Sequence, residues 1–296
     1  RSPSPFAETY PSFCLTVINI CFTCNAMVKV YGSERRGGLL RGIFLVLLAL
    51  FVLLILYLFL PFGTGRAVIL GSDARAGEAS RSDTIMVAGT GGLLAVPRDT
   101  LVEVPGVGQD KINAAFAFGG PELAVETLEG FTELPIGNYV ALDFGGVEEI
   151  VNALGGIKVN VEEPIETEQD GKFFSIPAGT QELTGDEALA YVRYRGGPTA
   201  DIGRIGRQQR FLAALAGEVS SPENLPRMPG TARAIWRNVE TNMGPFEAAR
   251  FAIRLAVLGG ASNSELYPGS PQYINGVSYW VPDTAAGQRV VEATIG

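Results

Sequence analysis

Histidine is absent from the 296-residue sequence, and its three cysteines all lie near the start. Without imidazole, a Ser-His-Asp triad, a histidine metal ligand and a histidine general base are excluded. The cysteines are Cys14, Cys21 and Cys24, so the rest of the chain contains neither a cysteine nucleophile nor a disulfide framework. The spacing in CFTC is that of half a zinc site, but no second cysteine pair completes it.

Positive charge is also scarce. Asp and Glu number 31 against 23 Lys and Arg, so the net charge is −8. Proteins that bind nucleic acid usually present a basic face, and we therefore expect no nucleic-acid partner. The motifs GxxxxGK[ST] and GxSxG are missing too, which excludes a P-loop enzyme and a hydrolase with a serine nucleophile elbow.

One long hydrophobic run, GIFLVLLALFVLLILYLFLP, extends from Gly42 to Pro61 without a charge. About 20 apolar residues cross a bilayer, so we expect a transmembrane helix over 42–61. Basic residues precede the run, and the positive-inside rule then places the N-terminus in the cytoplasm and the large domain outside the cell membrane. These residues are Lys29, Arg35, Arg36 and Arg41. A cleaved signal peptide is the alternative, but no small-residue cleavage site follows the run.

The predicted organisation therefore has three parts: a cytoplasmic segment over 1–41, the membrane helix over 42–61, and an extracytoplasmic catalytic domain over 66–296. Met27 begins an ordinary short cytoplasmic lead, VKVYGSERRGG. We interpret residues 1–26 as lying upstream of the natural start.

Strands and helices alternate along residues 66–296. Apolar runs predict strands at 66–70, 84–89, 93–97, 138–143, 157–161 and 278–282. Helical patterns follow Pro121, extend from Val147 to a closing Gly155, and recur at 185–193, 203–219, 231–239, 245–258 and the end of the chain. Thr184 and Glu187 form a capping box before the helix at 185–193. This interleaving predicts an α/β domain with helices covering a mixed sheet.

Opposite charges bracket the predicted hairpin in RSDTIMVAGTGGLLAVPRDT. If Thr90 and Gly91 are its loop residues, the numbers of any two paired residues add up to 181, and Asp83 faces Arg98. An exposed cross-strand ion pair of this kind would contribute under ~1 kcal/mol. Asp73, however, follows the first predicted strand, and ligand sites in α/β sheets favour strand ends. The three charges therefore predict a site.

A cluster of arginines occupies YVRYRGGPTADIGRIGRQQR. Its members are Arg193, Arg195, Arg204, Arg207 and Arg210. At helical spacing Arg204, Arg207 and Gln208 share a face with the apolar Phe211 and should point toward the core. Buried guanidinium is costly without an anion, and a helix N-terminus adds free N–H donors. The pattern favours a phosphate site over a solvated basic face, although the solvated face fits Arg210.

Two aspartates with several arginines indicate one chemistry above others. Carboxylates hold Mg²⁺ or a similar hard cation such as Mn²⁺, and arginines neutralise phosphate oxygens. Phosphoryl transfer depends mainly on positioning and charge neutralisation, so it requires no protein nucleophile.

The exported part resembles the LytR-CpsA-Psr family of bacterial cell-envelope phosphotransferases. Seven blocks carry the resemblance in order: ILGSDAR, RSDTIMV, VPRDT, DKINAAFAFGG, ALGGIKVNV, LTGDEALAYVRYR and GRIGRQQR. SYWVPD near the end fits as well. The resemblance implies a three-layer α/β/α domain with a mixed central sheet and an apolar tunnel for a polyprenyl chain. Lining by Phe116, Phe118, Leu123 and Phe144 is one hypothesis for that tunnel, and simple core packing is the other.

Family members transfer a glycopolymer phosphate from a polyprenyl-pyrophosphate carrier to peptidoglycan, forming a phosphodiester in cell wall biogenesis. The resemblance implies Mg²⁺ (or Mn²⁺) held by Asp73 and Asp83. It assigns the catalytic group to Asp73, Asp83, Arg98, Arg193 and Arg204. It assigns substrate binding to Arg195, Arg207, Gln208, Lys111 and Asn113. The implied partners are the lipid-linked glycopolymer, peptidoglycan and the membrane.

Three alternatives remain open. Water in place of the sugar hydroxyl would make the protein a polyprenyl-pyrophosphate-sugar hydrolase. A membrane-bound, non-catalytic regulator or attenuator is a second reading, although the cytoplasmic segment is too short for a DNA-binding domain. A passive wall-polymer binding module is the third, and it would not require two aspartates beside an arginine cluster.

Overall fold

The computed structural model describes residues 37–59, 65–72, 82–89, 91–196, 200–257 and 263–296, with backbone alone at 37–40, 58–59, 144, 200–201 and 256–257. The chain divides into two compact units, Arg1–Tyr57 and Leu58–Gly296. The strands described all lie in the second unit.

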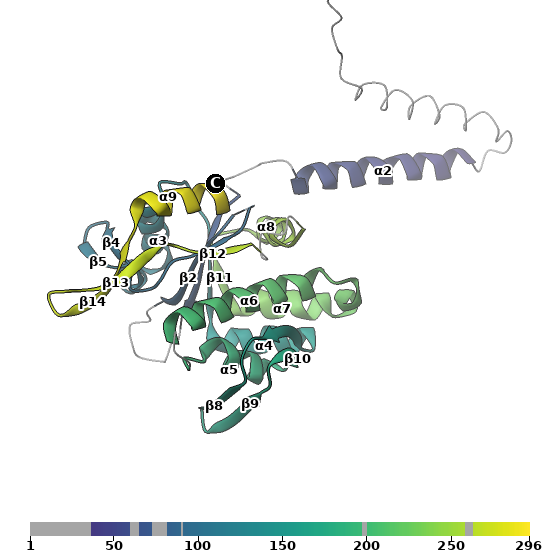
Figure 1. Cartoon of the computed structure of the whole chain (residues 1–296). Coiled ribbons are helices and arrows are strands. Elements are labelled where there is room, and N and C mark those ends of the chain that lie inside the picture. The colour runs from purple at the N-terminus through teal and green to yellow at the C-terminus, as the bar shows by residue number, and fades with distance from the viewer. Residues whose placement is uncertain (1–36, 60–64, 73–81, 90, 197–199, 258–262) are drawn as a thin grey trace, which may run out of the picture. The chain divides into compact units, whose positions relative to one another are not determined.

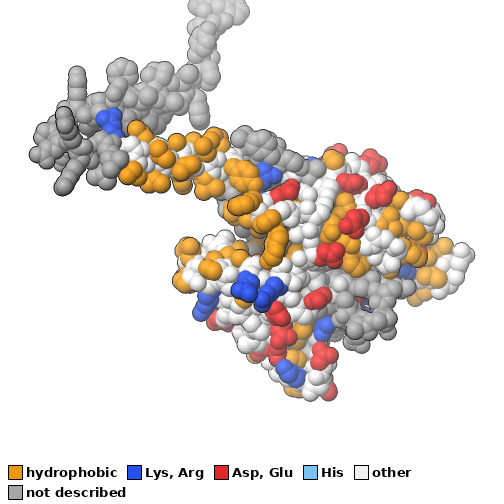
Figure 2. Space-filling view, turned by 180° about the vertical axis from the view of Figure 1, so that it is seen from behind, with side chains coloured by type: hydrophobic (Ala, Val, Ile, Leu, Met, Phe, Trp, Pro, Cys, Tyr) orange, Lys and Arg blue, Asp and Glu red, His pale blue; other side chains and the backbone are white. Residues whose placement is uncertain are grey.

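Helix α2 spans Gly37–Phe59. Its described side chains are exposed and almost all hydrophobic, as the orange helix in Figure 2 shows. Across the described residues, no helix is both long and apolar enough to cross a membrane. The span expected at 42–61 stays a prediction.

A six-stranded mixed sheet forms the centre of the second unit, in the order β11-β6-β1-β2-β3-β12 (Figure 1). β1 runs parallel to β6 and antiparallel to β2, and β3 runs parallel to β12. The bounds are β1 Ala67–Ser72, β2 Ser82–Ala88, β3 Leu93–Ala95, β6 Tyr139–Asp143, β11 Val239–Thr241 and β12 Ser264–Leu266. The predicted α/β class with a mixed sheet is confirmed.

Four two-stranded sheets flank the central one. They pair β4 Leu101–Val104 with β5 Gly108–Lys111, β7 Ile157–Val161 with β10 Gly179–Leu183, β8 Ile165–Gln169 with β9 Lys172–Ile176, and β13 Gly269–Ile274 with β14 Val277–Pro282. Of these strands, only β7 and β14 were expected from the sequence.

Helices cover both faces of the central sheet (Figure 1). They are α3 Ile112–Thr132, α4 Phe144–Leu154, α5 Gly185–Arg193, α6 Ala200–Ser220, α7 Met228–Asn238, α8 Pro245–Val257 and α9 Thr284–Thr294, with a 3₁₀ turn η1 at Pro222–Arg227. On one face Val68 and Ile85 of the sheet pack with Leu128 of α3 and Val291 of α9. On the other, α4, α5 and α6 cover the sheet and form a second core with β7.

Local signals set several helix ends. The capping box of α5 forms as expected. The Thr184 side chain accepts a hydrogen bond from the backbone N–H of Glu187, and the Glu187 side chain accepts one from the backbone N–H of Thr184. Gly155 closes α4 in the left-handed conformation at φ 88°. The helix expected from Pro121 is confirmed as the second part of α3, directly after a break at Gly119 and Gly120, whose backbone is not helical. The first part, from Ile112 to the break, was not predicted.

Candidate active site

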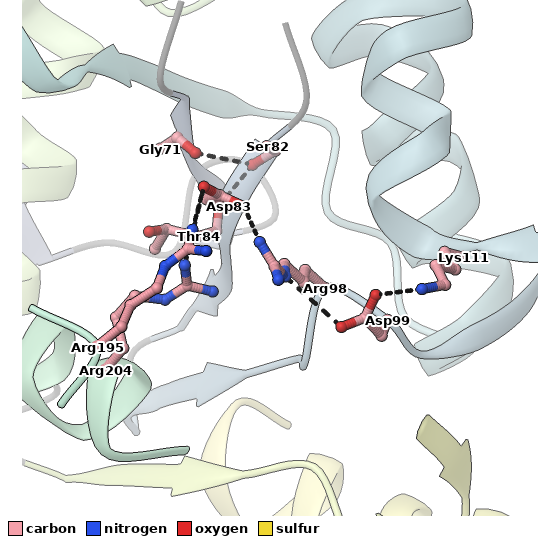
Figure 3. Close-up of polar contacts among 9 residues, drawn as sticks. All are labelled: Gly71, Ser82, Asp83, Thr84, Arg98, Asp99, Lys111, Arg195 and Arg204. Atoms are coloured by element: carbon pink, nitrogen blue, oxygen red, sulfur yellow. Dashed lines mark hydrogen bonds and ion pairs between the residues drawn. The ribbon is translucent and has the colours of Figure 1, made fainter. Parts of the chain in front are cut away.

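Asp83 lies at the start of β2 and collects three arginines around its carboxylate (Figure 3). Arg98 Nη1 is 2.5 Å from Asp83 Oδ1, and Arg195 Nη2 is 3.0 Å from Oδ2. Arg204 Nη1 approaches Oδ2 at 3.8 Å. The Asp83 side chain is 17% exposed, so the carboxylate sits in a sheltered and strongly positive environment.

The hairpin register predicted from the sequence is confirmed. Met86 pairs with Ala95 and Ala88 with Leu93, so the partners sum to 181. Beyond the ladder, Val96 still donates to the Ile85 carbonyl, and the Asp83–Arg98 ion pair continues the same alignment. Thr90 lies outside the described residues.

The cluster stands where two parallel strands end. Ser72 ends β1 beside Asp143, which ends β6, and Ser82 begins β2 opposite Ser72. The Ser82 hydroxyl donates to the carbonyls of Gly71 and Thr84 at 3.2 Å and 2.7 Å, as Figure 3 shows. The carboxyl ends of strands are the usual ligand-binding edge of an α/β sheet. Asp73, predicted here, lies outside the described residues.

The turn after β3 places Arg98. Thr100 donates to the Pro97 carbonyl through both its N–H and its hydroxyl, at 2.9 Å and 2.6 Å. Asn113 is buried at the start of α3, and its backbone N–H donates to the Arg98 carbonyl at 3.2 Å. Asn113, predicted to bind substrate, therefore supports the backbone of Arg98 in this structure.

Asp99 extends the charged network away from Asp83 (Figure 3). Its carboxylate accepts from Lys111 Nζ at 2.7 Å and lies 3.5 Å from Arg98 Nε. Lys111 also lies over the Tyr279 ring, 5.6 Å from its centre. Asp99 was missed by the sequence analysis, although its place directly after Arg98 in VPRDT was a usable signal.

Arg204 and Gln208 are buried, as the helical pattern predicted, at 2% and 4% exposed. The predicted start of their helix is wrong: α6 begins at Ala200, three residues before Gly203. Arg204 therefore follows the first turn, and it reaches Asp83 through its side chain. Both amide atoms of Gln208 are buried and have no hydrogen-bond partner among the described residues.

Two other predicted arginines also contact groups outside the Asp83 cluster. Arg193 Nη1 lies 3.3 Å from Asp170, an exposed residue between β8 and β9. Arg207 Nη2 donates to the Tyr194 carbonyl at 2.6 Å, and its guanidinium covers the Tyr194 ring at 5.0 Å. Burial lowers the pKa of Arg207. The structure thus brings Arg98, Arg195 and Arg204 to Asp83, and the catalytic role of Arg193 stays a prediction.

The lining proposed for a lipid tunnel stays a prediction. Phe116 and Leu123 pack against the core beneath α3, which agrees with the alternative of core packing, and Phe118 is 60% exposed. The Phe144 side chain lies outside the described residues. A small apolar cavity of 50 Å³ lies on the opposite face of the sheet, beside Gln208 and Phe211.

Among the described residues, Asp83 is the carboxylate that contacts all three arginines of the cluster. No group of three or more acidic or cysteine side chains that could hold a metal ion occurs in the described part of the chain. Mg²⁺ is commonly bound by one or two carboxylates together with substrate phosphates. Asp83 fits that requirement as one ligand.

Comparison with known proteins identifies relatives of the second unit. The model of the LytR_cpsA_psr family matches residues 64–295. A relative from Enterococcus faecalis, named polyisoprenyl-teichoic acid–peptidoglycan teichoic acid transferase TagU, is 35% identical over 228 residues, which cover 74% of each chain. The crystal structure of TagV from B. subtilis superposes with a TM-score of 0.67 at 32% identity, covering 77% of this chain and 94% of TagV. A structure titled TagT bound to LIIa-WTA gives 0.62 at 26% identity, covering 79% and 92%.

Proposed function

Because the chain belongs to the LytR_cpsA_psr family, we propose that it transfers a glycopolymer phosphate from a polyprenyl-pyrophosphate carrier to peptidoglycan. The acceptor hydroxyl gives its proton to water, and its oxygen bonds to the sugar-side phosphorus. The bridging P–O bond then breaks, and polyprenyl phosphate leaves. The name of the E. faecalis relative, a teichoic acid transferase acting on peptidoglycan, supports this reaction and this substrate class.

The arrangement of Arg98, Arg195 and Arg204 around Asp83 is the observation that carries the proposal. A pyrophosphate has several anionic oxygens, and charge moves onto its bridging oxygen as the bond breaks. Three guanidiniums converging on one point neutralise that charge, and Arg204 does so from a site shielded from water. Asp83 holds the three arginines together in this structure, so it keeps the pocket ordered for the anion.

We also propose that Mg²⁺ supports the reaction, with Asp83 and Asp73 as its protein ligands. Asp83 supplies the carboxylate that a cation bound between protein and phosphate requires. The cation would add neutralising charge to the pyrophosphate. Loss of transfer on chelation and its recovery on adding Mg²⁺ is the expected result, and transfer at an unchanged rate in excess EDTA would refute the requirement.

The membrane position is part of the same proposal. A polyprenyl carrier resides in a bilayer, so its transferase must work at that surface. We propose that residues 42–61 anchor the chain with a cytoplasmic N-terminus, because this stretch is uncharged and α2 occupies Gly37–Phe59. Protease protection in membrane vesicles of known orientation would test the topology.

Reconstitution of the full chain in detergent micelles tests the transfer. A polyprenyl-pyrophosphate-linked glycan, Mg²⁺ and uncrosslinked peptidoglycan serve as substrates, and mass spectrometry follows the joined phosphodiester and the released polyprenyl phosphate. Arg98→Ala should lower the rate by about 10²–10³, the typical cost of one charge-stabilising donor. Arg237→Ala, an exposed arginine of α7, is the matched control and should leave the rate unchanged.

The outcomes separate the possible activities. A joined product that Arg98→Ala abolishes supports transfer. Polyprenyl phosphate released without a joined product would show hydrolysis instead. Lipid that binds without any turnover would show a binding protein and contradict the proposed enzyme.

A further inference from the structure

A polar cavity is formed by residues next in sequence to those of the Asp83 cluster, and the proposed reaction gives it no ligand. Its volume is 180 Å³, and its main lining side chains are Glu162, Glu163, Tyr191, Tyr194, Arg207 and Arg210. Tyr194 and Gly203, which also lines it, directly precede Arg195 and Arg204, the two arginines that contact Asp83. Consecutive Cα atoms are about 3.8 Å apart, so the cavity and the Asp83 cluster share the backbone at 194–195 and at 203–204.

Tyr194 forms a rigid wall of this cavity. Arg207 covers its ring at 5.0 Å and binds its carbonyl at 2.6 Å. Gly196 lies against the Tyr194 hydroxyl so closely that a Cβ at this position would stand 2.0 Å from the Tyr194 oxygen. Arg207 and Gly196 therefore hold the ring in place, and any larger residue at 196 would displace it.

The polar groups of the cavity carry both signs of charge. Arg210 forms an ion pair with Glu162, and Glu163 adds an exposed carboxylate. Arg207 Nε is buried without a hydrogen-bond partner among the described residues. The Tyr191 side chain is buried beside Arg210, and burial raises the pKa of its hydroxyl while Arg210 opposes that rise.

These groups select the chemistry of a ligand. Two guanidiniums and two carboxylates cancel, so neither a phosphate nor a cation gains net attraction here. Donors and acceptors are both abundant, which suits a neutral molecule with many hydroxyl groups. A water needs about 10–15 Å³ of such a cavity, so its 180 Å³ accommodates a ligand the size of one six-membered sugar ring.

We propose that this cavity binds a single pyranose ring of a substrate, next to the phosphate held at the Asp83 cluster. The inference rests on the proposed function for the identity of the sugar. That ring belongs either to the lipid-linked donor or to the glycan strand that accepts the phosphate, and both present the same chemistry.

Binding measurements on the full chain in detergent micelles test the cavity without turnover. The probes are soluble uncrosslinked glycan strands and a polyprenyl-pyrophosphate-linked monosaccharide, each measured by isothermal titration calorimetry. Glu163→Gln removes one acceptor charge at the surface, and Gly196→Ala drives the Tyr194 ring from its place. Glu166→Gln on β8 is the matched control, since Glu166 is equally exposed and does not line the cavity.

We expect Glu163→Gln and Gly196→Ala each to weaken one probe by roughly tenfold, the usual effect of losing a hydrogen bond to a charged group. If only the glycan strands bind more weakly, the ring belongs to the acceptor. If only the lipid-linked sugar binds more weakly, the ring belongs to the donor. Wild-type affinity for both probes in Glu163→Gln would overturn the proposal, and so would a wild-type protein that binds neither sugar. Circular dichroism establishes that Gly196→Ala is folded.

Steady-state kinetics separate this inference from the proposed function. In the transfer assay, cavity variants should raise KM for the affected substrate by roughly tenfold with kcat preserved, whereas Asp83→Ala should lower kcat. Cavity-dependent sugar binding without any transfer would uphold the sugar site and refute the proposed reaction. Transfer with unchanged KM in both cavity variants would uphold the proposed reaction and refute the sugar site.

Discussion

Replacing Asp83 by Asn should destabilise the folded protein, because it removes the carboxylate that three arginines contact. The largest contribution comes from Arg204, whose side chain is 3% exposed and lies 3.8 Å from Asp83. At an effective dielectric constant of 20, a pair at that distance is worth about 4 kcal/mol. Removing one partner of a buried pair costs about 3–5 kcal/mol, which agrees with that figure.

The other two ion pairs add less. Arg195 is 49% exposed and Arg98 is 24% exposed, so solvent screens both, and each contributes up to about 1 kcal/mol. We therefore expect Asp83→Asn to lower the free energy of unfolding by about 4–6 kcal/mol. In a domain of this size, that corresponds to a fall in Tm of about 10–20 °C.

Urea denaturation and calorimetry of the full chain in micelles measure the loss. Asp170→Asn is the matched control, because Asp170 also pairs with an arginine but is 74% exposed. Asp170 has φ 52°, a conformation that Asn adopts readily, so this variant should change stability by less than about 0.5 kcal/mol. Inorganic pyrophosphate should stabilise Asp83→Asn more than the wild type, since the anion takes the place of the carboxylate.

A fall in Tm under about 2 °C in Asp83→Asn would refute the reasoning, because Arg204 would then be neutralised without Asp83. A large fall that pyrophosphate leaves unchanged would indicate lost packing and contradict the electrostatic cause.

Three further predictions concern stability. Thr184→Ala removes the capping box of α5 and should cost about 1 kcal/mol in urea denaturation, and an unchanged midpoint would contradict the cap. Burial and the hydrogen bond to Glu122 raise the pKa of Tyr139 to about 12. The contribution of the Tyr139 proton to stability is therefore complete below about pH 10 and is lost as the pH rises toward 12. Tyr139→Phe should lose less unfolding free energy over that pH range than the wild type, and an equal loss in both proteins would contradict the raised pKa. The hydrogen bond to Asp186 and the negative charge of Asp186 raise the pKa of Glu148. The stabilising proton on Glu148 is therefore present below pH 4.5 and is lost as the pH rises through the raised pKa. Glu148→Gln should raise the free energy of unfolding at about pH 7 but not at about pH 4, and a difference that does not depend on pH would refute the shared proton.

Much of the site could be predicted because its signals are local. The register of the hairpin followed from one turn and the period of a strand, and it placed Asp83 opposite Arg98. The burial of Arg204 and Gln208 followed from their helical spacing with apolar Phe211. Each of these inferences needs only the geometry of a single hairpin or helix.

Other features depended on contacts between distant segments. The β8–β9 hairpin places Asp170 against Arg193, which the arginine pattern alone had assigned to the phosphate site. The helix start after Gly119 and Gly120 was predicted correctly, but the helix at 112–118 ahead of that break was not. It begins after Lys111 without a side-chain cap, so no capping signal marked it in the sequence.

The sequence by itself determined the chemistry of this protein: no imidazole, no thiol in the domain, and aspartate and arginine in ordered blocks that match one family. Tertiary structure alone decided which arginines meet at Asp83 and which contact Asp170 and Tyr194. The reason is physical. Residue type sets what a side chain can bind, but the energy of a charge depends on its neighbours and its burial, and only the folded chain determines those.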